Sequence, residues 1–96
     1  MQFEWDNNKN QANISKHAIS FDTAKLVFAD NNKIISHNRT VDNEERLQVV
    51  GKIAEILIVM VVFTPRNGAI RIISARKASK KERAIYENQY TNAKRN

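Results

Sequence analysis

The chain of 96 residues has no cysteine, a single proline, two glycines and no long apolar run. Without cysteine, it has neither a disulfide framework nor a thiolate zinc site. The longest apolar run, Ile56 to Phe63, is eight residues, far below the roughly 20 that span a bilayer. The start, "MQFEWDNNKN", has acids and amides where a signal peptide would have a basic and then an apolar segment. We therefore expect a small cytoplasmic protein with no membrane contact.

The scarcity of histidine, cysteine and glycine argues against metal and nucleotide sites. The only histidines are His17 and His37, which lie far apart in the sequence and have no cysteine or carboxylate cluster beside them. The acidic stretch "DNEE" reads as a solvated turn. Two distant glycines cannot form a P-loop or a G-x-G-x-x-G turn. We expect no metal and no cofactor.

Positive charge is present, and it is unevenly distributed. Residues 1–63 contain seven Lys/Arg and eight Asp/Glu, whereas residues 64–96 contain nine and two, so the net charge of +6 arises entirely in the last third. Such a cluster attracts polyanions, of which nucleic acid is the commonest. A merely solubilising surface is the alternative that charge alone leaves open.

The N-terminal part predicts one short strand and two helices. "FEWD" alternates like a strand from Phe3 to Asp6, and Asp6 is a good N-cap for a polar helix over residues 7–17. Ser20 can cap a second helix over residues 21–30. Its apolar stripe is Phe21, Ala24, Val27 and Phe28.

The remainder predicts a sheet and a last helix. "KIISH", "RLQVVG", "EILIVMVVF" and "AIRIISA" read as strands, and Asn67-Gly68 is a strong hairpin signal between the last two. The third of these is apolar on both faces, as in the middle of a sheet. "SKKE" is a capping box that opens a helix to about Tyr90. We predict a single α+β domain over 1–96, in the order β-α-α-β-β-β-β-α and ending in a short flexible tail. Its small antiparallel sheet packs against two N-terminal helices and a C-terminal helix.

The junction between the last strand and the last helix is dense in cations. Strict alternation places Arg71, Ile73 and Ala75 on one face of the strand, and Arg76 follows at its exit. Lys80, Lys81 and Arg83 lie in the first turn of the helix, where cations oppose the helix dipole. A local conflict of this kind is typical of a binding site, and a helix start also attracts phosphate.

These residue types also suit RNA cleavage without a metal. When a 2′-hydroxyl attacks the adjacent phosphorus, guanidinium groups can hold the charge that builds on the phosphorane oxygens. His17 and Tyr86 are the candidates for the proton transfers. Spacing alone does not decide between cleavage and simple nucleic-acid binding.

Three segments in order, "FEWDNNKNQANISKHAISFDTAKLVF", "EERLQVVG" and "RIISARKASKKERAIYE", resemble the BrnT family of type II toxins. Members of that family look like relatives of the wider RelE-like ribonuclease toxins. The resemblance implies a RelE-like fold and an RNA-cleaving toxin. It also implies a BrnA-like antitoxin with a ribbon-helix-helix region, and contact with operator DNA only through that antitoxin.

The resemblance also carries site residues over by position. It implies catalytic roles for Arg71, Arg76, His17 and Tyr86. It implies RNA binding by Lys9, Asn13, Lys16 and Arg46, and the charge at the start of the last helix adds Lys80, Lys81 and Arg83 as RNA-binding candidates. The looser RelE-like comparison also singles out Lys80. One departure stands out, because the family has glycine after its Lys-His pair and this chain has Ala18. A degenerate toxin that binds antitoxin or nucleic acid without cleaving is the alternative function.

Overall fold

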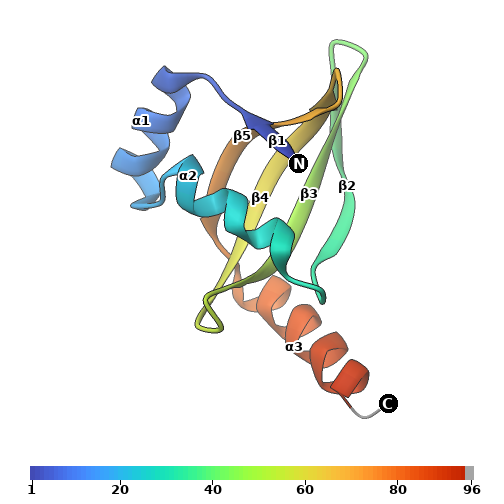
Figure 1. The fold of residues 1–96 in the computed structure, drawn as a ribbon. Helices are drawn as coiled ribbons and strands as arrows, with labels where there is room; N and C mark the ends of the chain where they lie inside the picture. Colours follow the sequence, from blue (N-terminus) through green and yellow to red (C-terminus); the bar gives the residue numbers. More distant parts are fainter. Residues whose placement is uncertain (95–96) are drawn as a thin grey trace.

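The computed structural model describes the backbone of residues 1–94 and the side chains of residues 1–89, and its α+β architecture confirms the predicted order of elements (Figure 1). Five strands form one sheet in the order β1-β5-β4-β3-β2. The apolar strand β4 lies in the middle, as its sequence predicted. The elements are β1 (Gln2–Glu4), α1 (Asn7–His17), α2 (Phe21–Ala24), the 3-10 helix η1 (Lys25–Ala29), β2 (Ile34–Val41), β3 (Glu44–Ile53), β4 (Leu57–Arg66), β5 (Ala69–Lys77) and α3 (Lys80–Lys94).

Strands β2 to β5 form an antiparallel meander with tight hairpins. The predicted Asn67-Gly68 turn joins β4 to β5, with φ of 52° and 80°. Asp42 and Asn43 join β2 to β3, with φ of 51° and 64°. Positive φ at both central residues is the geometry whose twist matches the flanking strands. The acidic stretch is therefore a turn only in its first half, since Glu44 already belongs to β3.

The expectation of a purely antiparallel sheet is wrong at one edge. β1 pairs in parallel with the start of β5, with Glu4 beside Arg71. The sheet is therefore mixed. The meander leaves the outer side of β5 unpaired, and the short N-terminal strand pairs with its first three residues.

One face of the sheet, called the first face, is covered by α2 and η1, which cross in front of the strands in Figure 1. The predicted second helix is thus divided into a short α-helix, capped by Ser20, and a 3-10 helix. Phe21, Ala24 and Val27 are fully buried in this layer. Phe28 meets Phe63 of β4 edge-on, with ring centroids 4.9 Å apart.

Helix α1 covers the rest of the β5 edge, and the side chain of Asn13 connects the helix to the strand. Its amide donates to the Ala75 carbonyl (2.9 Å) and accepts from the Ala75 N–H (3.0 Å), as a neighbouring strand would. It also donates to the carbonyl of Ile19 at 2.9 Å. This buried side chain therefore takes up backbone hydrogen-bonding groups at an open strand edge, which would otherwise be free to pair with another chain.

The opposite face, called the second face, is covered at one end by α3. Tyr86 is only 1% exposed there and packs with Val50, Ile58 and Met60. Its hydroxyl donates to the Asp30 carboxylate at 2.6 Å. Asp30 follows η1, so this bond joins the layers that cover the two faces of the sheet.

Asp30 reaches the sheet itself through β3. The same carboxylate oxygen that bonds Tyr86 accepts from the Lys52 N–H at 2.8 Å. Gly51 makes the approach possible, because a Cβ there would lie 2.7 Å from Val27 Cγ2 and 3.2 Å from Asp30 Oδ2. Burial alone would raise the pKa of Asp30, but the bonds from Tyr86, Lys52 and Asn32 hold it below its usual range.

The start of α3 is fixed to β5 by the predicted capping box. Glu82 accepts from the Ser79 N–H at 2.8 Å, and the Ser79 hydroxyl accepts from the Glu82 N–H at 3.2 Å. Arg76 donates to both oxygens of Glu82, at 2.8 and 3.0 Å. The hydrogen bond from Arg76 lowers the pKa of Glu82.

Ala18 adopts the left-handed conformation that glycine would favour, with φ of 59°, and its N–H bonds to the Ile14 carbonyl at 2.8 Å. A Cβ in this region costs on the order of 1 kcal/mol. We therefore expect Ala18→Gly to raise the free energy of unfolding by about 1 kcal/mol in urea titrations. The matched change Ala12→Gly inside α1 should instead lower it by about 1 kcal/mol. Equal effects of the two changes would contradict the strain at Ala18.

Asp30 and Glu82 also predict how stability depends on pH. Because both pKa values are lower in the folded state, the unfolded chain binds more protons in acid. Their stabilisation is complete above the ordinary carboxyl pKa of about 4 and is lost as the pH falls through the lower folded-state values. The variants Asp30→Asn and Glu82→Gln should each flatten the loss of stability below about pH 5, as measured by denaturation at a series of pH values.

Candidate nucleic-acid interface

A β-bulge in β5 determines which side chains reach the second face. Phe63 pairs with Ile72 and Val62 pairs with Ser74, so one extra residue lies between them in β5. As a result, Ala75 belongs to the core of the first face, while Arg71, Ser74 and Arg76 are all on the second face. The expectation from strict alternation, which grouped Ala75 with Arg71, is wrong for this reason. The bulge places both arginines of "RIISAR" on the same side of the sheet.

Beyond α3, the second face carries a row of arginines across the strands. Arg39 of β2 lies opposite Arg46 of β3, and Arg71 of β5 lies opposite Thr64 of β4. The register of β3 and β4, continued by one residue, places Thr64 beside Arg46. We call Arg39, Arg46 and Arg71 the arginine row; it ends at Glu4 of β1.

Arg46, in the centre of this row, has an unusual environment. Its Nε is buried and has no hydrogen-bond partner among the described residues. Another arginine, Arg39, lies directly across the strand pair, where like charges are destabilising. The pKa of nearby Glu44 is lowered first by its bond from Arg66, and also by the charges of Arg46 and Arg71. A further anion on the row would therefore relieve the repulsion between these arginines.

Arg71 and Arg76 do not converge in this structure. They lie opposite Thr64 and Met60, four residues apart on β4, which corresponds to about 13 Å along the strand. Arg71 bonds to Glu4 at 2.8 Å, whereas Arg76 bonds to Glu82 in the opposite direction. The two guanidinium groups thus face different carboxylates and do not enclose a single phosphate site.

The predicted basic side of α1 lies at the border of the same face. Lys9, Lys16 and His17 line a shallow depression together with Ser74 of β5. Ser74 lies between Arg71 and Arg76 on the second face. The depression therefore continues the arginine row toward α1, and His17, which is half-buried, stands at its margin.

The other predicted residues are placed less favourably for direct contact. Tyr86 and Asn13 are buried and already bonded within the fold. Lys80, Lys81 and Arg83 are exposed at the start of α3. Sequence reasoning missed Arg39, because only the strand register shows that it faces Arg46.

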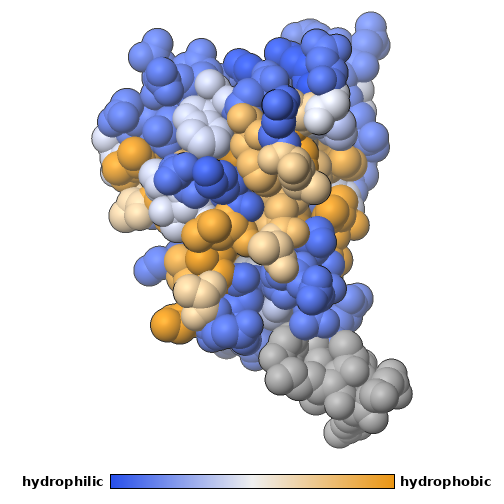
Figure 2. Space-filling model, in the orientation of Figure 1, coloured by the Kyte–Doolittle hydropathy of each residue, from blue (hydrophilic) through white to orange (hydrophobic). Residues whose placement is uncertain are grey.

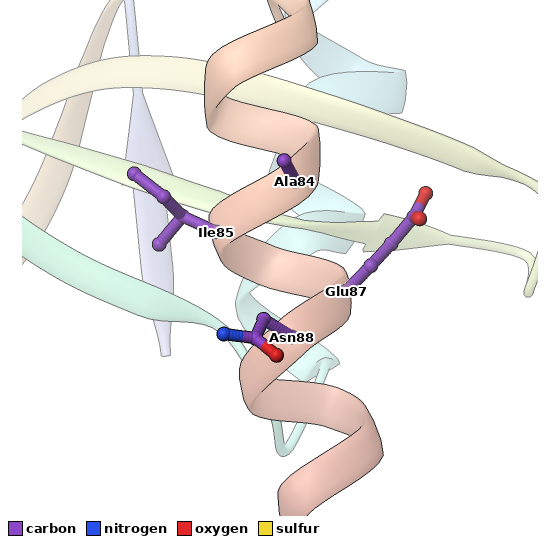
Figure 3. A pocket seen from close by; sticks show the side chains of 4 residues that line it. All are labelled: Ala84, Ile85, Glu87 and Asn88. Carbon is purple, nitrogen blue, oxygen red and sulfur yellow. The ribbon is translucent and has the colours of Figure 1, made fainter.

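Other depressions are poorer sites for a polyanion. One, in Figure 3, lies on the outer surface of α3 and is lined by Ala84, Ile85, Glu87 and Asn88. Another lies beside η1 on the side shown in Figure 2, where apolar side chains gather. Its lining is mostly apolar and has one cation, Lys25.

Two absences concern metal ligands and membrane-spanning helices among the described residues. No group of three or more His, Cys, Asp or Glu side chains among residues 1–89 is arranged to hold a metal ion. None of the helices in the described part of the chain has the length and apolar character needed to cross a membrane.

Comparisons with known proteins agree with the predicted fold. The crystal structure of the Brucella abortus ribonuclease toxin BrnT superposes with a TM-score of 0.62 and is 29% identical, covering 83% of this chain and 99% of that one. No curated protein matches the sequence significantly. The model of the family described as "Ribonuclease toxin, BrnT, of type II toxin-antitoxin system" matches residues 5–82. Since this match covers most of the chain, the protein belongs to the BrnT family of ribonuclease toxins.

Proposed function

We propose that this chain is a cytoplasmic endoribonuclease toxin that cleaves RNA without a metal ion and thereby arrests growth. The observation that carries the proposal is the arginine row on the uncovered part of the second face, with Arg46 at its centre. RNA offers what this surface needs, namely a chain of anions with oxygen acceptors. Family membership supports the same activity.

The chemistry follows from these groups. The 2′-hydroxyl of a ribose loses its proton as its oxygen bonds to the adjacent phosphorus, and the 5′-oxygen of the next nucleotide gains a proton and leaves as a hydroxyl, which yields a cyclic phosphate. Water exchanges whichever of these two protons His17 does not transfer. Arg46 and Arg71 stabilise the charge on the non-bridging oxygens as the phosphorane forms. His17, at the margin of the face, transfers a proton to or from one of the reacting oxygens. Lys9 and Lys16 of α1, and Lys80, Lys81 and Arg83 of α3, bind neighbouring phosphates.

Three of the residues expected at the site receive a different role in this proposal. Tyr86 and Asn13 are positioning residues, because their polar atoms hold α3 and α1 in place. Arg76 fixes the start of α3 through its ion pair with Glu82.

A non-catalytic binding module is the second candidate. The observation that favours it is the neutralisation of Arg71 by Glu4 and of Arg76 by Glu82. A surface of this kind would still bind RNA, with an affinity that falls steeply with salt.

We also propose a partner. Type II systems pair a toxin with a protein antitoxin, and we infer a BrnA-like antitoxin with a ribbon-helix-helix region. In this proposal the antitoxin supplies all contact with operator DNA, and the toxin supplies none.

The proposal predicts cleavage of RNA in the presence of EDTA, with Arg46 required. Arg46→Met keeps the apolar stem and removes the charged fork, so we expect a loss of about 100-fold in the cleavage rate. Lys25→Met, on the opposite face, removes the same charge and should retain the wild-type rate. If the folded wild-type protein leaves RNA intact at equimolar dose, the enzyme proposal fails. Binding without cleavage would then identify the non-catalytic module.

The proposed role of Tyr86 is tested by removing only its hydroxyl. Tyr86→Phe leaves a buried Asp30 oxygen with one donor fewer, which should lower the free energy of unfolding by about 1–3 kcal/mol. RNA cleavage by the folded variant should stay within about twofold of the wild type, at a temperature where both are native. A loss of about 100-fold or more with an unchanged fold would instead make Tyr86 a catalytic residue.

A further inference from the structure

A small hollow lies on the second face between α3 and strands β2 and β3. Its lining consists of Ile34, Ser36, Gln48, Val50, Glu82 and Ile85. Gln48 follows Arg46 by two residues on β3, so it lies next to the arginine row on the same face. Glu82, on the other side, is the partner of Arg76. The hollow is therefore placed between the row and the start of α3.

The lining combines apolar walls with an oriented amide. Ile34, Val50 and Ile85 provide the apolar part, and Ile85 projects from α3 on the side away from Glu87 (Figure 3). The Gln48 Oε1 accepts from Asn38 Nδ2 at 3.0 Å. This bond uses the acceptor end of the Gln48 amide, and Nε2 has no hydrogen-bond partner among the described residues. Gln48 thus lines the hollow with an amide that Asn38 orients and whose donor end is not used within the described part of the chain.

We infer that this hollow receives an unpaired nucleobase of the bound RNA, and that the Gln48 amide reads a hydrogen-bond acceptor on the edge of that base. The inference rests on the proposed function and adds to it that the substrate is single-stranded and is selected by base.

Three observations favour a nucleobase over other occupants. A base has apolar faces and a polar edge, which matches a lining that combines aliphatic side chains with an amide. The hollow adjoins the arginine row, so phosphates on the row would hold the strand where a base can enter. The row is positive, which complements the RNA backbone. Paired bases cannot enter such a hollow, because they are stacked inside the duplex.

The decisive experiment reverses the hydrogen-bonding character of Gln48. Gln48→Glu keeps the size of the side chain and its bond from Asn38, but replaces the free donor by an acceptor. Cleavage sites of the wild type and the variant are mapped on a pool of single-stranded RNA with randomised sequence. We expect the preference at one position to move by about 10-fold toward bases that present an amino group there. Gln11→Glu, on the exposed side of α1, adds the same charge elsewhere and should keep the wild-type pattern.

The apolar side chains that line the hollow are tested separately. Ile85→Ala should weaken binding of a non-cleavable 2′-deoxy oligonucleotide by about 5- to 10-fold. Ile56→Ala, in the exposed β3–β4 turn, should have no effect.

Cleavage by Gln48→Glu with an unchanged site pattern overturns the base-reading inference and leaves the ribonuclease proposal intact. Failure of the wild type to cleave any RNA overturns the ribonuclease proposal itself. Weaker antitoxin binding by both hollow variants, with the cleavage pattern unchanged, would assign the hollow to the antitoxin and also overturn the inference.

Discussion

The arrangement of the helices and the sheet in this protein depends most on the hydrogen bonds of the Asp30 carboxylate. One of its oxygens accepts from the Tyr86 hydroxyl of α3 and from the N–H of Lys52 in β3. It therefore joins the helical layer of the first face, the sheet and the helix of the second face at one point. Only a glycine at position 51 leaves room for that approach. Together with the packing of Tyr86 against the sheet, this bond and the Arg76–Glu82 pair fix where the helix begins and how much of the second face it covers.

The uncovered part of that face follows from the same constraint. Because α3 packs only over the end of the sheet near Val50 and Met60, side chains at the other end remain accessible. Arginines occupy the accessible end, and their mutual repulsion is offset only partly by Glu4 and Glu44. The like charges on this surface repel one another, and an RNA strand would neutralise them. The position of α3 and the accessibility of the arginine row are thus consequences of the same division of the second face.

Much of the fold could be predicted from local signals. The Asp6 and Ser20 caps, the Asn67-Gly68 turn and the Ser79–Glu82 capping box all form as expected. These signals act within a few residues, so they do not depend on the rest of the chain. The parallel pairing of β1 was not predictable in the same way. It depends on which edge of the meander remains open, and that is known only once the strands are assembled.

The sequence by itself determined the elements, their order, the basic character of the last third and the resemblance to the BrnT family. Only the tertiary structure decided which basic residues share a surface. The bulge in β5 changes the face of every residue after Ile73, because side chains alternate with a period of two and one extra residue reverses the pattern. For this reason Arg71 and Arg76 lie on one side of the sheet. The pairing of β3 with β2 and β4 places Arg46 between Arg39 and Thr64, with Gln48 two residues further along the same face. Long-range register, which no short stretch of sequence encodes, assembled the candidate site.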